Sequence, residues 1–427
     1  MKLRIEKPIY GGAGLARHEG KAIFVDRALP GELVEAEIVT NKRSYSEAHV
    51  KQVLEAAAER VTPPCPHYGA CGGCQYQHAS DSEQLRMKAA ILQETLERAR
   101  LKEMPEIEVI VAEPWGYRNR IRLHVQARPF ALGYRRGQSH VVLPVEECGI
   151  AAPILVRAMH VLAEQCEVEL AGWAREVELF TEDTARRLLV SVYADAATPK
   201  MQGRLDALWA RLQSVMPEVA GCAGFALPAG RGIARRAATA GESHLMYGAG
   251  GMQYRVSAGA FFQVNRFLIN RMLEAASEGP AGEAAWDLYA GVGLFTKVLA
   301  QRFEHVIAVE AAPESAADLR VNVPAARVVA ATTLDFLRQA MQGSGKAKAA
   351  PELVVVDPPR AGLGQEVTAL LARIRPAHIT YVSCDPATLS RDLFALLQSG
   401  YRFRSVQLLD MFPQTFHVET ITQLTLE

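Results

Sequence analysis

In the carboxyl-terminal half of the chain, short strand-like runs alternate with segments that have the spacing of amphipathic helices. The runs include His305 to Val309, Leu353 to Val356 and Ile379 to Val382, and a polar or turn-forming residue closes each of them. Buried parallel strands have short, nearly continuous apolar runs, and helices return the chain from one strand to the next. This pattern predicts an α/β domain with a Rossmann-like sheet over residues 260–427.

The first residues have a different pattern, in which short β-type runs are separated by glycine turns. These runs are Leu3 to Ile5, Ala22 to Val25, Leu33 to Val39 and His49 to Leu54. Several short strands with regular turn signals are typical of a small barrel. We therefore expect an OB-like β-barrel over residues 1–57.

The stretch between these two parts, residues 58–259, mixes helical and strand patterns and predicts an α+β domain. Ser80 and Glu83 have capping-box spacing and begin a predicted helix that runs to about Arg100. From Trp115 to His140 the alternation of side chains is typical of strands instead. A chain of 427 residues is long enough for this three-domain division.

Composition and charge narrow the class of protein. The chain has no apolar run of eighteen or more residues without a charge, which excludes an ordinary membrane-spanning helix. Its first residues lack the apolar core of a signal peptide, so we expect a cytoplasmic protein without a membrane partner. The formal net charge is zero, so a polyanionic partner must be met by a local basic patch.

The cysteines predict a metal centre in the central domain. Of the seven cysteines, Cys65, Cys71 and Cys74 have the spacing C-x5-C-x2-C, and Cys148 is the best candidate for a fourth ligand. In a chain without an export signal, such a set favours a metal site over disulfides. Four thiolates suit either zinc or an iron–sulfur cluster, and the spacing alone does not separate the two.

Arginines are concentrated between Pro114 and Val145, a stretch that contains no Asp or Glu. They alternate with aromatic residues, and Arg can bind phosphates while aromatic rings stack on unpaired bases. This stretch therefore predicts an RNA-binding surface on a strand-rich sheet. The arginines are Arg118, Arg120, Arg122, Arg128, Arg135 and Arg136.

The candidate nucleophile is Cys384, which follows the apolar run Ile379 to Val382 and precedes a predicted helix. Open α/β sheets bind their ligands at the carboxyl ends of the strands, where this thiol is expected to lie. A helix amino terminus also favours the thiolate form of a cysteine. By itself, a lone cysteine is more often a small buried apolar residue.

Three further segments of the same half are expected to lie at the same edge of the sheet. The first is a glycine-rich turn, Asp287 to Gly293, and Glu310 follows the next strand at the position where an acid binds ribose hydroxyls. Asp357 ends a strand before two prolines, and Glu419 lies in an apolar stretch near the carboxyl terminus. The missing third glycine of the dinucleotide motif favours a methyltransferase over a nicotinamide enzyme.

In order along the chain, these motifs resemble those of the RNA uridine 5-methyltransferase family. The amino-terminal part is similar to the TRAM module, with Y-G-G-A-G-L-A from Tyr10 and L-P-G-E from Leu29. The remaining motifs are F-F-Q, D-L-Y-A-G-V-G, D-P-P-R, S-C-D-P and D-M-F-P followed by H-V-E. Together with C-x5-C-x2-C and Cys148, they resemble most closely the iron–sulfur-containing bacterial branch that modifies ribosomal RNA.

This resemblance implies a class I methyltransferase domain that uses S-adenosylmethionine to methylate carbon 5 of a uridine in RNA, most closely 23S ribosomal RNA. Cys384 matches the family nucleophile and Glu419 its general base. The cysteine set matches the ligands of a [4Fe–4S] cluster. The residues that match cofactor contacts are Gln263, Tyr289, Glu310 and Asp357.

Two positions depart from the family pattern. Leu294 stands where many members have Asn, and Gln414 replaces the usual His ahead of Glu419. Four other functions stay open on the residues alone. They are transfer RNA uridine methylation, RNA cytosine 5-methylation, nicotinamide-dependent oxidation and RNA binding without catalysis. A monomer is expected.

Overall fold

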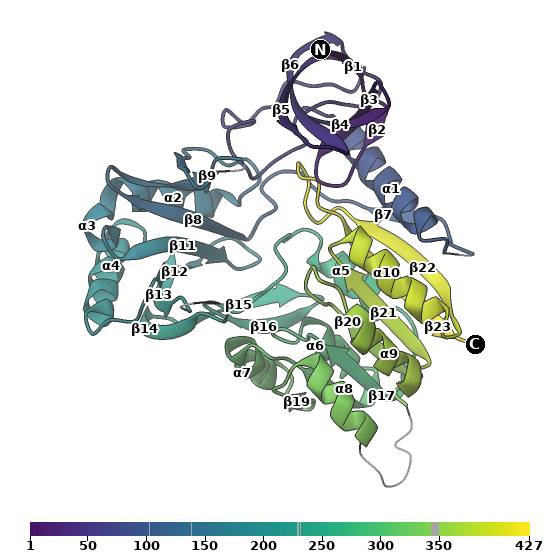
Figure 1. The fold of residues 1–427 in the computed structure, drawn as a ribbon. Helices are drawn as coiled ribbons and strands as arrows, with labels where there is room; N and C mark the ends of the chain where they lie inside the picture. Colours follow the sequence, from purple (N-terminus) through teal and green to yellow (C-terminus); the bar gives the residue numbers. More distant parts are fainter. Residues whose placement is uncertain (102, 138, 229, 231, 343–349) are drawn as a thin grey trace.

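The computed structural model describes residues 1–427 except 102, 138, 229, 231 and 343–349. The chain folds into an amino-terminal barrel, a central sheet and a carboxyl-terminal α/β domain (Figure 1). The described helices include none that is both long and apolar enough to cross a membrane.

The amino-terminal domain is a β-barrel, as the sequence predicts. Its sheet has the strand order β1-β5-β6-β4-β3-β2. Alternate residues are buried in β4 and in the first half of β5, so that Ile23 and Val25 of β4 pack against Val34 of β5 in one small core. The strands are β1 (Lys2–Arg4), β2 (Lys7–Pro8), β3 (Ala13–His18), β4 (Lys21–Asp26), β5 (Leu33–Asn41) and β6 (Tyr45–Glu55).

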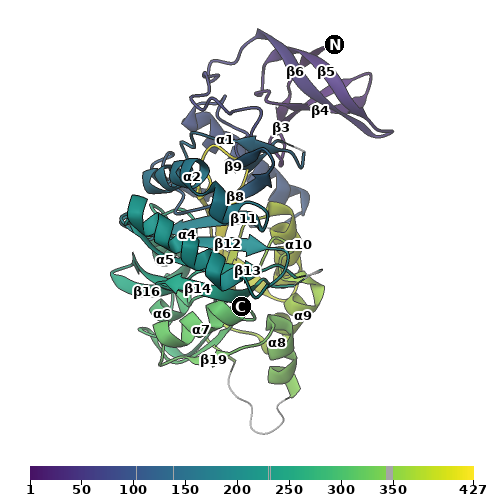
Figure 2. The same cartoon turned by 90° about the vertical axis from the view of Figure 1, so that its left-hand side faces the viewer.

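The central sheet has the order β10-β9-β8-β11-β12-β13-β14 and is covered on both faces. Helices α2 (Pro153–Gln165), α3 (Glu167–Leu170) and α4 (Met201–Val215) belong to the central domain, and Figure 2 shows α2 and α4 on its outer side. The hairpin of β15 (His244–Ala249) and β16 (Met252–Ser257) contributes to the core of the opposite face. The strands are β8 (Arg120–Ala127), β9 (Phe130–Arg135), β10 (Val142–Pro144), β11 (Ala174–Thr181), β12 (Leu188–Ala194), β13 (Val219–Ala226) and β14 (Arg235–Gly241).

This double cover explains why every residue of β12 is buried. Val190 and Val192 pack in the core that contains α2 and α4. Leu189 and Tyr193 point the other way, into a core that continues through the hairpin to the carboxyl-terminal domain. The central sheet is therefore joined to the third domain by a continuous apolar interface.

The carboxyl-terminal sheet has the order β19-β18-β17-β20-β21-β23-β22-β7. Strands β17 to β21 are parallel, whereas β23 runs antiparallel between β21 and β22. The strands are β7 (Ile107–Ile110), β17 (Gly282–Leu288), β18 (Phe303–Val309), β19 (Arg327–Val329), β20 (Leu353–Val356), β21 (His378–Ser383), β22 (Tyr401–Leu409) and β23 (Glu419–Leu426). The predicted Rossmann-like sheet is confirmed, and its last two strands in the chain, β22 and β23, form an antiparallel pair.

Helices cover both faces of this sheet, which is why its strands are apolar runs. In β20, Val354 and Val356 share a core with α8, α9 and α10, whereas Leu353 and Val355 share one with α5 and α6. The helices are α5 (Ile269–Ser277), α6 (Leu294–Leu299), α7 (Pro313–Asn322), α8 (Thr333–Gln342), α9 (Gly364–Ile374) and α10 (Pro386–Leu397).

Two elements from the predicted central stretch pack on the third domain instead. Helix α1 (Asp81–Arg98) lies against α10 and β7, and β7 pairs in parallel with β22. Ser80 caps α1 as expected, because its hydroxyl accepts the backbone N–H of Glu83 at 3.3 Å. The division at residue 260 stays a prediction, but the carboxyl-terminal sheet includes residues from well before it.

Candidate active site and cysteine cavity

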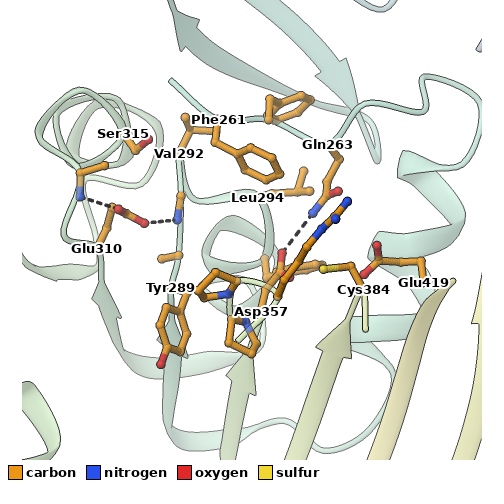
Figure 3. A pocket seen from close by; sticks show the side chains of 18 of the residues that line it. Phe261, Gln263, Tyr289, Val292, Leu294, Glu310, Ser315, Asp357, Cys384 and Glu419 are labelled. Atoms are coloured by element: carbon orange, nitrogen blue, oxygen red, sulfur yellow. Dashed lines mark hydrogen bonds between the residues drawn. The ribbon is translucent and has the colours of Figure 1, made fainter. Parts of the chain in front are cut away.

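A cavity of about 500 Å³ opens at the carboxyl ends of the parallel strands in the third domain. All of the residues proposed from the sequence for catalysis and cofactor binding line it, as Figure 3 shows. Cys384 and Glu419 lie side by side at one end, and Glu310 lies at the other end. The lining residues are Gln263, Tyr289, Glu310, Asp357, Cys384 and Glu419, with Leu294, Arg360, Phe412 and His417 among others.

Glu310 is held by the glycine-rich turn. Its carboxylate accepts the backbone N–H of Gly291 at 2.9 Å and that of Ala312 at 2.6 Å. The turn needs glycine at position 293, where φ is +91° and an added Cβ would lie 2.5 Å from Leu319. The acid and the turn predicted from separate motifs therefore form one rigid end of the cavity.

Asp357 lies between the two ends of the cavity. Gln263 donates its side-chain N–H to the Asp357 carboxylate at 3.0 Å, so that two residues expected to contact the cofactor also contact each other. Burial raises the pKa of Asp357 to about 7, and the neighbouring Asp287 carboxylate adds to the shift. Asp287, which belongs to the glycine-rich motif, is fully buried and accepts a hydrogen bond from Thr296.

Strand pairing sets the position of Cys384 beside Glu419. Ser383 of β21 is the partner of Thr420 of β23 in an antiparallel ladder, so that the residues one step further on are neighbours. Cys384 follows directly after β21, and Glu419 is the first residue of β23. Two residues far apart in the sequence thus share one end of the cavity.

The charge state of this thiol differs from the expectation. Burial, together with the charges of Glu419 and Asp357, raises the pKa of Cys384 to about 12. Asp385 caps α10 by accepting the N–H groups of Ala387 and Thr388, at 3.0 Å and 2.9 Å. The helix terminus was predicted to favour the thiolate, but Asp385 already accepts two of its N–H groups, and the charges of Glu419 and Asp357 disfavour the thiolate.

The pKa of Glu419 is raised as well. Burial raises its pKa well above the ordinary range, and the charge of Asp357 adds to the shift. The Arg360 guanidinium acts in the opposite direction on the pKa values of both Glu419 and Cys384. Arg360 stands in the predicted D-P-P-R motif, but sequence reasoning assigned it no role.

Two further residues at this end of the cavity were missed. Tyr10 comes from the amino-terminal barrel, and its hydroxyl donates to the backbone carbonyl of Cys384 at 3.4 Å. Its ring packs edge-on against Phe416, with 5.4 Å between centroids. His417 lies 3.3 Å from Arg360, between their ring and guanidinium nitrogens. No signal in the sequence connects Tyr10 with a cysteine 374 positions away.

The four cysteines predicted to bind a metal line a second cavity, of about 270 Å³. Burial raises the pKa values of Cys65 and Cys71, and it raises that of Cys74 to about 12. Among the described residues, no three His, Cys, Asp or Glu side chains form a group that could hold a metal ion. The structure thus places the expected ligands around one cavity, without the close group that a single metal ion needs.

The predicted RNA-binding face contains ion pairs that the local sequence does not show. Strand β11 lies beside β8 and sets Glu178 opposite Arg122. Arg120 pairs with Glu178 at 3.4 Å, and Arg122 pairs with Glu176 at 3.3 Å and Glu178 at 3.4 Å. The local absence of Asp and Glu therefore does not leave these two arginines unpaired, because the balancing carboxylates come from a strand distant in sequence.

The other arginines of this stretch have two different environments. Arg118 lines the cysteine cavity, and its Nε is buried without a hydrogen-bond partner in the described part of the chain. Its guanidinium also lies 6.0 Å from the centre of the Phe412 ring. Arg128, Arg135 and Arg136 are exposed, and within the described residues they form no ion pair. These three are the cations of the stretch that remain available to a polyanion.

Comparison with known proteins agrees with this geometry. Residues 80–426 match the family described as tRNA (uracil-5-)-methyltransferase, and residues 1–51 match the TRAM domain. An uncharacterized RNA methyltransferase of Aquifex aeolicus is 36% identical, over 99% of this chain and 98% of that protein. The 23S rRNA (uracil(1939)-C(5))-methyltransferase of Klebsiella pneumoniae is 33% identical, over 96% of this chain and 92% of that protein.

A solved structure shares the whole fold. It is the Pyrococcus abyssi tRNA (uracil-54, C5)-methyltransferase in complex with S-adenosyl-L-homocysteine, with a TM-score of 0.76, 24% identity and 99% coverage of both chains. The carboxyl-terminal domain accordingly has the class I methyltransferase fold. The family match and the full-length relatives show that this chain belongs to the tRNA (uracil-5-)-methyltransferase family and is an S-adenosylmethionine-dependent RNA (uracil-5-)-methyltransferase.

Proposed function

We propose that this enzyme methylates one specific uridine of 23S ribosomal RNA, with Cys384 as the nucleophile and Glu419 as the base. The β21–β23 pairing carries the proposal, because it places a thiol and a carboxyl side by side in the large cavity. Relatives that are 31–34% identical over nearly the full chain are named for a uridine of this RNA, which supports the choice of substrate.

The cavity residues fit the cofactor of this family. Glu310 would hold hydroxyl groups, and Gln263, Tyr289 and Asp357 would line the rest of the binding site. Acidic groups suit a ligand that carries positive charge, and the space of about 500 Å³ is within the usual range for small-molecule sites. Bound there, S-adenosylmethionine supplies an electrophilic methyl group for carbon 5 of the uracil.

The chemistry explains why a thiol and a carboxylate are both needed. Carbon 5 of uracil is a poor nucleophile until the Cys384 thiolate, whose proton has been released to solvent, bonds to carbon 6. Once carbon 5 has gained its methyl group, Glu419 removes the proton that carbon 5 still carries. The double bond re-forms as the carbon 6–sulfur bond breaks, and Glu419 returns its proton to the departing thiolate. One proton is released in each turnover.

The choice of ribosomal RNA is tested in cells that lack this protein. We expect 5-methyluridine to disappear from one position of 23S ribosomal RNA and to remain unchanged in transfer RNA. The measurement is mass spectrometry of nuclease fragments from both RNA classes, with a strain carrying the restored gene as control. Loss of the modification from transfer RNA alone would overturn the choice of substrate.

The two catalytic residues act at different stages, so their substitutions have different outcomes. Cys384→Ala should give neither methylation nor a covalent adduct, because no bond to carbon 6 forms. Glu419→Gln should accumulate a methylated protein–RNA adduct that survives denaturation and depends on S-adenosylmethionine. Removing a general base costs about 10²–10⁴-fold in rate, so release of this adduct should be slow.

Denaturing gels with labelled RNA measure these adducts for each variant. An adduct formed by Cys384→Ala would exclude this residue as the nucleophile. Turnover of Glu419→Gln at the parent rate would exclude Glu419 as the base.

The raised pKa of Cys384 predicts a slow reaction of this thiol with iodoacetamide in the free enzyme. At pH values well below a pKa of about 12, the thiolate fraction is small and grows tenfold for each pH unit. The alkylation rate should therefore still be rising at pH 10. Arg360→Met removes a charge that lowers this pKa and should slow alkylation further, whereas Arg360→Lys should not. Mass spectrometry of the Cys384 peptide gives the rate. An alkylation rate that levels off just above pH 9, the ordinary pKa of a cysteine thiol, would contradict the raised pKa.

We also propose that the cysteine cavity holds a [4Fe–4S] cluster. Four thiols line one cavity, which fits the Cys₄ ligation of such clusters. Thiols around several iron atoms stand farther apart than those around one zinc ion, which is consistent with the absence of a close group among the described residues. When bound, the cluster would link Cys65, Cys71 and Cys74 to Cys148.

Protein purified without oxygen is therefore expected to be brown and to contain about four irons per chain. Cys148→Ala should lose the iron, because one of the thiolate ligands is removed. Cys222→Ser is the matched control, since Cys222 is buried in the central sheet and does not line the cavity. Metal analysis and the visible spectrum measure both variants. Stoichiometric zinc in a colourless protein would overturn the proposal.

A further inference from the structure

The loop 410–418 connects β22 to Glu419 and has no helix or strand of its own. Its backbone carbonyls accept hydrogen bonds from several distant parts of the chain instead. The Met411 carbonyl accepts from the Asn265 side chain at 3.2 Å, and the Pro413 carbonyl accepts from the Tyr117 hydroxyl at 3.0 Å. Donors outside the loop therefore determine its shape.

Helix α1 supplies a further donor for the same loop. The Lys88 ammonium is fully buried, and it donates to the Asp410 carboxylate at 2.6 Å and to the Phe412 carbonyl at 2.9 Å. A buried charge is costly unless it is paired, so this contact fixes the start of the loop strongly. Phe412 and His417, which follow within the loop, line the active-site cavity.

Gln414, at the centre of the loop, has all of its polar groups hydrogen-bonded. Its carbonyl accepts the backbone N–H groups of Gln75 and Tyr76, both at 3.0 Å. Its own N–H and its side-chain oxygen pair with the Gln84 amide, both at 2.9 Å, and its side-chain N–H donates to Asp81 at 3.0 Å.

Gln414 is also 1% exposed and has a φ of +68°, a left-handed conformation that side chains other than glycine rarely adopt. The network around Gln414 compensates for this unfavourable backbone conformation. Loss of these bonds would therefore allow the loop to leave its present shape.

We propose that Gln414 is a positioning residue that couples the cysteine-bearing segment to the general base. Gln75 and Tyr76 follow Cys74 directly, so that the residue after the last cysteine of the motif is bonded to the loop that ends at Glu419. Gln414 therefore connects the segment that follows Cys74, which lines the cysteine cavity, to the loop whose Phe412 and His417 line the active-site cavity. This proposal rests on the proposed role of Glu419 as the base.

The coupling should affect one stage of the reaction, the release of the covalent adduct. Cys384 is positioned by β21 and α10, and it contacts the loop only indirectly, through the packing of Tyr10 on Phe416. Addition to carbon 6 and methylation should therefore be affected much less than release. Glu419 follows the loop directly, so a loosened loop should displace it. A displacement of about 1 Å can cost about 10²-fold in rate. The expected effect is slow release of the adduct after normal formation.

The kinetic experiment uses Gln84→Ala, which removes the partner of Gln414 without touching the cavity. Single-turnover measurements with labelled RNA should show adduct formation within about twofold of the parent and release slowed by about 10²-fold. Gln93→Ala is the matched control, because it makes the same change on the exposed side of the same helix. Gln414→Gly is a second variant, which keeps the left-handed backbone and should also slow release.

Hydrogen–deuterium exchange of residues 410–418 tests the coupling without an activity measurement. Cys74→Ser and Gln84→Ala should both increase exchange in this loop, whereas Cys222→Ser and Gln93→Ala should leave it unchanged. Unchanged exchange in Cys74→Ser, or equal slowing of adduct formation and release in Gln84→Ala, would overturn the proposal. Glu419→Gln distinguishes failure of the coupling proposal from failure of the proposed function. If this variant trapped no adduct, the proposed function would be contradicted.

Discussion

The antiparallel insertion of β23 between β21 and β22 is the constraint on which the active site depends. A parallel sheet brings only the carboxyl ends of its strands to the binding edge. Because β23 runs in the opposite direction, its first residue, Glu419, lies at that edge beside Cys384. The pairing of Ser383 with Thr420 fixes this register, and a slip of one residue would turn the carboxyl to the other face of the sheet.

The raised pKa values of the site follow from this arrangement. Burial disfavours ionisation of Cys384, Glu419 and Asp357. The charges of Glu419 and Asp357 add to this effect on Cys384, and the charge of Asp357 adds to it on Glu419. Arg360 is the cation that acts on both Cys384 and Glu419 in the direction of ionisation. The free enzyme therefore holds Cys384 as a thiol.

Parts of the chain outside the methyltransferase domain complete the site. Tyr10 of the barrel contacts the backbone at Cys384, and Lys88 of α1 pairs with Asp410 at the start of the loop before Glu419. The apolar core between the central sheet and the β15–β16 hairpin holds the cysteine-bearing domain against the same catalytic domain. RNA that contacts the barrel would thus lie on a domain that also contacts the backbone at Cys384.

Local patterns in the sequence were sufficient for the strands, for the glycine turn beside Glu310, for the cap of α1 by Ser80 and for the residues that line the main cavity. Each of these depends on neighbours a few positions away, or on motifs whose order was visible along the chain.

Only the tertiary structure determined the ion pairs, the pKa shifts and the contacts between residues that are distant in sequence. The carboxylates that pair with Arg120 and Arg122 lie on β11, and the groups that raise the pKa of Cys384 come from other strands. The contacts of Tyr10 with Cys384 and of Gln414 with Gln84 join positions more than 300 residues apart. Coulomb interactions and hydrogen bonds depend on distance in space, which the order of residues does not specify until the chain has folded.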